Sequence, residues 1–216
     1  MEVDLVVLEQ RCVAALSESV ASGGDVAHDL GHIGRVVRNA RALAAAEGAR
    51  LDVVIPAAWL HDCVVVPKDS PQRSGASRLA AGLAVQWLRA WGWAEILLPE
   101  IAHAIEAHSF SAKLSPRTIE AKVVQDADRL DAIGAVGLAR CLMLSGAMHR
   151  PLYASDDPFC EQRQADDEAS AVDHFHTKLL SIESLMQTAS GRREAQRRTE
   201  FLHLFLSELR REISAD

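Results

Sequence analysis

Apolar side chains recur at the spacing of an α-helix along much of this chain. Val36, Val37, Ala40, Leu43 and Ala44 lie on one face of such a helix. The 216 residues include only 7 prolines and 12 glycines, and no stretch of useful length alternates apolar and polar side chains as a strand would. Ala, Leu, Glu, Arg and Gln, which favour helices, are abundant. The sequence therefore predicts an all-α bundle.

Turn and capping residues set the limits of the predicted helices. Asp25 is the expected N-cap of the second helix, Gly48 its stop, and Pro56 falls in the first turn of the third. The segments 64–75 and 146–167 carry loop residues. We expect one domain over 1–216, with a core at about 25–145 and a helical hairpin at about 168–213 packed on it or forming a dimer surface. The predicted helices span residues 3–21, 25–47, 52–62, 76–91, 95–108, 117–130, 134–145, 168–188 and 191–213.

Composition argues against several classes of protein. The net charge of -7 disfavours a broad grip on nucleic acid. No apolar run approaches the ~20 residues of a membrane span, and the acidic N-terminus lacks the basic start of a signal peptide. We therefore expect a soluble, cytoplasmic protein. The cysteines form no CxxC pair, so we expect buried free thiols; they are Cys12, Cys63, Cys141 and Cys160.

The dipeptide His61-Asp62 ends the apolar run 53–60, and further metal-binding residue types flank it in sequence. A buried helix tolerates several carboxylates only with a counter-charge, which a divalent cation supplies. Each residue alone is more often structural: a lone histidine is commonly a surface or hydrogen-bonded core residue, and an Asp run a solvated helix end. The order of the residues is what indicates a metal site. The flanking residues are His28 and His32 upstream, which share a helix face, and Asp126, Asp128 and Asp131 downstream.

This order resembles the HD-domain metal-dependent phosphohydrolases, whose pattern is H, then HD, then D on an all-helical fold. The resemblance implies that His32, His61, Asp62 and Asp128 hold one divalent ion, with open positions for water and a phosphate oxygen. Mn, Mg, Fe, Co, Ni and Zn all suit such ligands, and we favour Mn or Mg. The chain is similar to one bacterial branch, whose characterised relatives remove pyrophosphate from nucleoside triphosphates. The stretches that carry this similarity are 27–36, 57–62, 67–77, 108–111, 125–134 and 174–188.

The chain departs from the family in ways that bear on catalysis. Many nucleotidase members carry an acid three positions after the His-Asp pair, where this chain has Val65. Asp131, His108 or metal hydroxide must then serve as the base, although Asp131 is as well explained as a helix cap. Two-metal members use extra histidines, but His103 and His108 are separated by roughly 140° on a helix. We therefore expect a single metal, with Asp62, His108 and Asp131 as catalytic residues.

Basic and hydroxyl groups after the metal pair are the predicted substrate contacts. Lys68 and Arg73 can hold phosphate oxygens, and Ser77 opens a helix whose N-terminal amides favour an anion. His28 is expected to contact substrate or orient a ligand. A solvated loop with ordinary capping is the alternative.

The predicted activity is hydrolysis of a small nucleotide by a metal-dependent phosphohydrolase, with a (deoxy)nucleoside triphosphate pyrophosphohydrolase as the specific expectation. The alternative enzyme activities are those of a 5'-nucleotidase or a phosphodiesterase. The non-enzymatic alternative is a sensor that binds metal and nucleotide without catalysis. A homodimer is compatible with the sequence. No nucleic-acid or membrane partner is expected.

Overall fold

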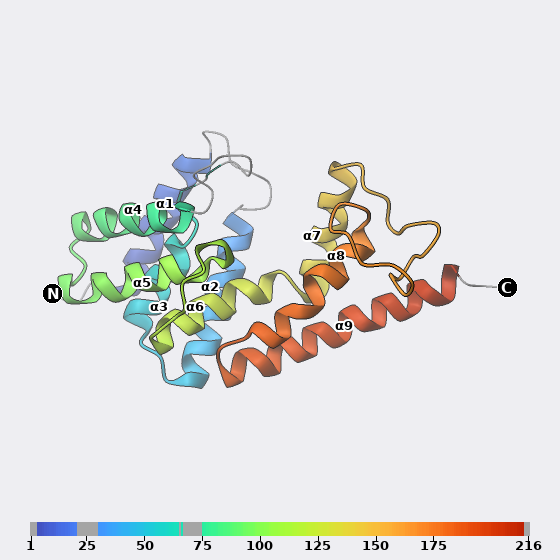
Figure 1. Cartoon of the computed structure of the whole chain (residues 1–216). Helices are drawn as coiled ribbons and strands as arrows, with labels where there is room; N and C mark the ends of the chain where they lie inside the picture. The colour runs from blue at the N-terminus through green and yellow to red at the C-terminus, as the bar shows by residue number, and fades with distance from the viewer. Residues whose placement is uncertain (1–3, 21–29, 65, 67–74, 214–216) are drawn as a thin grey trace. The chain divides into compact units, whose positions relative to one another are not determined.

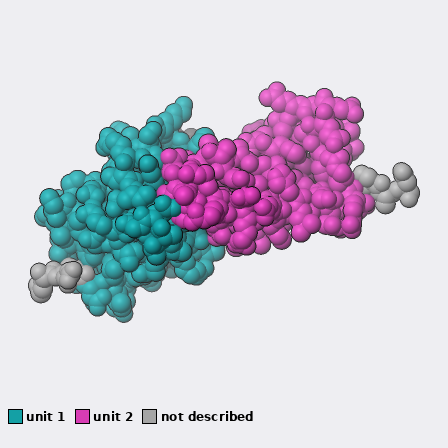
Figure 2. All heavy atoms as spheres, turned by 90° about the horizontal axis from the view of Figure 1, so that it is seen from below, with its two compact units in different colours: residues 1–128 teal, residues 129–216 magenta. Residues whose placement is uncertain are grey.

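The computed structural model describes residues 4–20, 30–64, 66 and 75–213 (Figure 1). Within these ranges all regular structure is helical and no strand occurs, which confirms the all-α prediction. The chain divides into two compact units, residues 1–128 and 129–216 (Figure 2). The single domain with a packed C-terminal hairpin stays a prediction.

The first unit is organised around its most apolar helix, α3. Seven of the ten residues of α3 are buried, and the helix packs against α1, α2, α4 and α5. The chain that leaves the C-terminal end of α3 therefore begins inside the unit. The elements of this unit are α1 (Leu5–Val20), α2 (Leu30–Glu47), α3 (Leu51–Leu60), α4 (Ala76–Ala90), η3 (Glu95–Leu97), α5 (Leu98–His108), η4 (Phe110–Ala112) and α6 (Ile119–Asp131), the last of which runs past the unit boundary.

The position of Pro56 differs from the prediction. Because α3 begins at Leu51, Pro56 lies inside the helix rather than in its first turn. Proline has no N–H, so the carbonyl of Asp52, four residues earlier, loses its usual helical donor. The indole Nε1 of Trp93 donates to that carbonyl instead, at 3.2 Å. A tertiary contact therefore satisfies the carbonyl and lets the helix continue to Leu60.

Other predicted helix ends agree with the structure where it describes them. Gly48 ends α2 with a φ of 70°, a conformation that favours glycine. The predicted helix 95–108 begins as the 3-10 turn η3 before α5. The predicted N-cap Asp25 lies outside the described residues.

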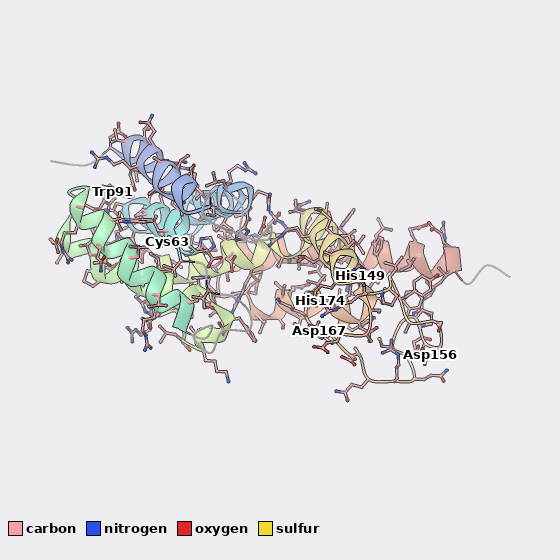
Figure 3. The ribbon with its side chains drawn as sticks, turned by 90° about the horizontal axis from the view of Figure 1, so that it is seen from above. Cys63, Trp91, His149, Asp156, Asp167 and His174 are labelled. Carbon is pink, nitrogen blue, oxygen red and sulfur yellow. The ribbon has the colours of Figure 1, made fainter. Side chains whose placement is uncertain are left out.

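The second unit contains one error of prediction. We expected one helix over 168–188, but α8 ends at Thr177 and a 3-10 helix follows after Lys178, whose φ of -138° is not helical. Thr177 Oγ1 and His174 Nδ1 both bond to Asp167 Oδ1, at 2.8 and 2.5 Å, so the last turn of α8 is held against the loop that precedes the helix. Figure 3 labels His174 and Asp167 of this contact. The elements of this unit are α7 (Gly134–Ala147), α8 (Ala171–Thr177), η5 (Leu179–Leu185) and α9 (Ala189–Ile213).

The predicted loop between α7 and α8 is ordered by a buried ion pair. Asp173 on α8 is fully buried and accepts two bonds from the Arg163 guanidinium, at 2.6 and 2.9 Å. This guanidinium holds the pKa of Asp173 well below its usual range. On α9, Glu194 forms ion pairs with Arg197 and Arg198, so acidic side chains offset the basic residues of this segment.

Across the described part of the chain, no single helix has both the length and the hydropathy needed to cross a membrane. The helices α6 and α7 reach that length and hydropathy only when they are counted together across the break between them.

Candidate metal centre

Four segments of the first unit bring imidazole and carboxylate groups to one place. His32 lies on the buried face of α2, and His61 and Asp62 follow directly on α3. His108 is the last residue of α5, and Asp128 lies on α6. The apolar pattern of each helix fixes which of its residues face inward, so these polar groups are drawn into the core with their neighbours.

The predicted ligands approach one another closely. Asp128 Oδ1 lies 3.5 Å from His32 Nε2 and 3.8 Å from His61 Nε2. Asp62 Oδ2 lies 3.6 Å from the same His61 nitrogen. Ligand atoms that bind one first-row metal at about 2.0–2.2 Å stand roughly 3 Å apart. Each of these atom pairs is therefore close enough to share an ion after small side-chain adjustments.

His108 joins this cluster through the other carboxylate oxygen of Asp62. His108 Nε2 lies 3.4 Å from Asp62 Oδ1, and its ring centroid is 4.9 Å from that of His61. Ligand atoms of His61, Asp62 and His108 lie within 4.8 Å of one another, as do those of His32, His61 and Asp128. His108 can therefore either ligate an ion or handle a proton beside it.

Backbone carbonyls orient two of the imidazoles. His61 Nδ1 donates to the Ala58 carbonyl at 2.8 Å, and His108 Nδ1 donates to the Ile105 carbonyl at 2.5 Å. Because a carbonyl only accepts, each Nδ1 carries a proton and Nε2 is the atom left for the centre. Fixing one nitrogen in this way is how proteins present histidine to a metal.

The nitrogen of His61 tests whether a cation fits here. His61 is fully buried, and its Nε2 has no hydrogen-bond partner in the ranges that the structure describes. Burial lowers the pKa of His61, so the ring is neutral and points a lone pair toward the two carboxylates. Such an orphaned acceptor facing anions is costly unless a cation lies between them. The donor set of neutral imidazoles and carboxylates suits a divalent first-row metal.

The electrostatics of His108 differ from those of His61. Burial alone would lower the pKa of His108, but the Asp62 carboxylate outweighs it and raises this pKa above the usual value. The side chains of Asp62 and Asp128 are 24% and 29% exposed, so water can reach the carboxylates while the imidazoles stay buried.

Other predicted site residues have different surroundings. Asp131 is buried and its Oδ2 accepts from Arg140 at 2.7 Å within the second unit, which favours a structural role over the predicted catalytic one. Ser77 is buried in the first turn of α4. His28, Lys68 and Arg73 lie outside the described residues.

Cys63, labelled in Figure 3, follows the metal pair, and its surroundings do not favour a reactive thiol. Its thiol is buried and donates to the Ala80 carbonyl at 3.4 Å. Burial raises the pKa of Cys63 to about 12, so the thiolate is not populated near neutral pH. The structure therefore agrees with the prediction that this cysteine is a buried free thiol.

Gln125 links two helices that carry residues of the centre, and the sequence pattern alone predicted no role for it. It is buried on α6, one turn before Asp128, and its Nε2 donates to the Ala107 carbonyl beside His108 at 2.6 Å. The only sequence signal was an amide at a position that the apolar pattern of the helix turns inward.

Comparisons with known proteins agree with this geometry. Residues 29–133 match the family described as HD domain, a range that holds all five residues of the centre. The uncharacterized protein YpgQ of Bacillus subtilis (strain 168) is 34% identical over 200 residues, which cover 91% of this chain and 89% of YpgQ. The chain belongs to the HD-domain family. HD domains bind divalent metals, and this membership makes the chain a metal-dependent phosphohydrolase.

Solved structures of family members have the same fold. The crystal structure of Bacillus subtilis YpgQ in complex with ADP has a TM-score of 0.73 at 34% identity, covering 96% of this chain and 95% of that one. An HD-superfamily hydrolase from Bacillus thuringiensis has a TM-score of 0.73 at 28% identity, covering 96% and 99%. The predicted family and fold are both confirmed.

Proposed function

We propose that this HD-domain protein hydrolyses (deoxy)nucleoside triphosphates to the monophosphate and pyrophosphate. The observation that carries the proposal is the buried Nε2 of His61, which has no hydrogen-bond partner among the residues described and faces two carboxylates at 3.6 and 3.8 Å. A phosphorylated nucleotide as substrate class is supported by the ADP complex of the related YpgQ. In this proposal water attacks the α-phosphorus, the α–β bridging bond breaks, and pyrophosphate leaves.

His32, His61, Asp62 and Asp128 would hold one divalent ion, with Mn or Mg favoured. When bound, the ion supplies Lewis-acid activation of water and neutralises charge that develops on the phosphoryl oxygens. The contribution of the chain is to keep His61 and His108 in the tautomer that faces the site, through the carbonyls of Ala58 and Ile105.

His108 and Asp62 form the proposed proton-handling pair. Their 3.4 Å separation allows His108 Nε2 to hold a proton beside the carboxylate, within reach of an oxygen in the site. Asp131 is a less suitable base because Arg140 already engages its carboxylate. Cytoplasmic location, absence of nucleic-acid partners and a homodimer stay predictions.

The test is product identification with metal-depleted protein. The protein is dialysed against chelator, then incubated with Mn, Mg, Fe, Co, Ni or Zn and a panel of mono-, di-, tri- and cyclic (deoxy)nucleotides. We expect equal amounts of monophosphate and pyrophosphate from a triphosphate. Orthophosphate from a monophosphate, or opening of a cyclic nucleotide, would support the nucleotidase or phosphodiesterase hypothesis instead.

Matched variants separate the metal centre from general damage to the fold. Asp62→Asn and Asp128→Asn should each lower kcat/KM roughly 100-fold or more, because charge neutralisation by the ion contributes several kcal/mol. Glu95→Gln, which changes an exposed acid on η3, should behave as wild type. Full activity in either aspartate variant contradicts the ligand assignment. Metal and nucleotide binding without turnover under every condition identifies a sensor.

A further inference from the structure

The first turn of α4 contains a buried polar group that has no partner among the described residues. Ser77 is 4% exposed, and its Oγ makes no hydrogen bond within this part of the chain. A buried hydroxyl without a partner costs about 1–3 kcal/mol, and proteins rarely retain one without a reason. Its place in the fold indicates what the partner is.

Two side-chain contacts fix the start of α4 beside the metal centre. Cys63, the residue after Asp62, donates through Sγ to the Ala80 carbonyl at 3.4 Å. On the other side, Arg78 Nε donates to Glu106 Oε1 at 2.8 Å, two residues before His108. The first two turns of α4 are therefore bound to both chain segments that supply the Asp62 and His108 pair.

The start of α4 has the chemistry of an anion site. The first amides of a helix have no partner within it and carry partial positive charge. The N-cap residue is Gly75, which has no side chain to cap them, and a Cβ built there would meet no atom within 4 Å. Helical side chains lean toward the N-terminus, so the Ser77 hydroxyl faces the same end as these amides.

We propose that the first turn of α4 is a phosphate-binding subsite of the metal centre, in which Ser77 Oγ donates to a non-bridging oxygen of the substrate polyphosphate. The subsite rests on the proposed hydrolysis of a nucleotide phosphoanhydride. It assigns the orphaned hydroxyl to the substrate and makes Ser77 a substrate-positioning residue.

The probe is inorganic pyrophosphate, titrated into protein saturated with Mn and followed by calorimetry. Ser77→Ala should weaken its binding roughly tenfold, as expected for loss of a hydrogen bond to a charged acceptor. The KM for a nucleoside triphosphate should rise by a similar factor, whereas the affinity for Mn alone stays unchanged. The apo variant should have an equal or higher Tm, because it lacks the unsatisfied hydroxyl and alanine favours helices. A merely structural Ser77 would lower Tm and leave pyrophosphate affinity unchanged.

Two further variants complete the test. Ser77→Cys preserves the size of the side chain with a weaker donor and should lose most of the pyrophosphate affinity. Ser207→Ala removes an exposed hydroxyl from α9 and should have no effect. Wild-type pyrophosphate affinity in both Ser77 variants overturns the subsite, even if the enzyme hydrolyses triphosphates as proposed. If Ser77→Ala loses pyrophosphate binding while the wild type turns over no nucleotide, the subsite stands and the proposed activity fails.

Discussion

The indole of Trp93 donates to the one carbonyl of α3 that Pro56 leaves without a helical donor, the carbonyl of Asp52, at 3.2 Å. α3 is the helix that ends at the metal pair, directly before His61. The bond from Trp93 explains how this buried helix tolerates a proline in its middle.

A double-mutant cycle on Trp93 and Pro56 tests this explanation. Trp93→Phe leaves the Asp52 carbonyl without its donor and should cost about 1–3 kcal/mol in the free energy of unfolding. In a Pro56→Ala background the restored amide can serve the carbonyl, so the same Trp93→Phe change should cost about 1 kcal/mol less. Chemical denaturation measures all four proteins. Trp91→Phe, at a half-buried neighbouring position, is the control. If Trp93→Phe lowers the free energy of unfolding equally in both backgrounds, Trp93 does not replace the donor that Pro56 lacks.

Gln125 should couple the stability of the core to the geometry of the site. Its bond to the Ala107 carbonyl joins α6, which carries Asp128, to α5, which ends at His108. Gln125→Ala should lower stability by about 1–3 kcal/mol and also weaken metal binding, because Asp128 loses its tie to α5. Gln86→Ala, at an exposed site on α4, is the matched control. A Gln125→Ala protein that is destabilised but binds Mn with wild-type affinity would show that the bond has no role in the site.

The proposed metal ligands could be picked out from the sequence because each has a recognisable local setting, and the resemblance to the HD-domain family joined them into one set. His61 and Asp62 are adjacent at the end of an apolar run, and Asp128 and His32 lie on helices whose inward faces follow from the 3.6-residue period. The roles of Gln125 and Trp93 depend instead on partners 18 and 41 residues away, which no period encodes. The apolar period that predicted one helix over 168–188 likewise did not mark the break at Lys178.

The connection between α5 and α6 should loosen at acidic pH through His103. Its Nε2 accepts from the backbone N–H of Arg117 at 3.0 Å, which requires a neutral ring. Burial and the nearby Arg117 charge lower the pKa of His103, and Glu106 opposes them only in part. Because the folded pKa lies below the unfolded value of about 6.5, the stabilisation is complete above that value. It is lost as the pH falls toward the folded pKa.

The change that tests this is His103→Gln, since a glutamine oxygen can accept the same bond without titrating. Urea unfolding at pH 8 and pH 5 should show a smaller loss of stability on acidification in the variant than in the wild type. The protection of the Arg117 amide against hydrogen exchange, relative to its intrinsic exchange rate at each pH, should fall at pH 5 only in the wild type. His203→Gln, an exposed position on α9, should preserve the wild-type difference. Equal pH dependence in wild type and His103→Gln would rule out this role of the bond between His103 and the Arg117 amide.

Two glycines of α7 should respond oppositely to the same substitution. A Cβ at Gly137 would lie 2.2 Å from the carbonyl carbon and oxygen of Ala132, so the backbone must shift. A Cβ at Gly146 would meet no atom within 4 Å. Gly137→Ala should therefore lower the free energy of unfolding by about 1–3 kcal/mol, whereas Gly146→Ala should raise it by about 0.5–1 kcal/mol through helix propensity. Thermal and urea unfolding of both variants measure the contrast. Only a displaced Ala132 backbone could accept the methyl group added at Gly137. A Gly137→Ala protein as stable as Gly146→Ala would therefore contradict the tight packing of the turn between α6 and α7.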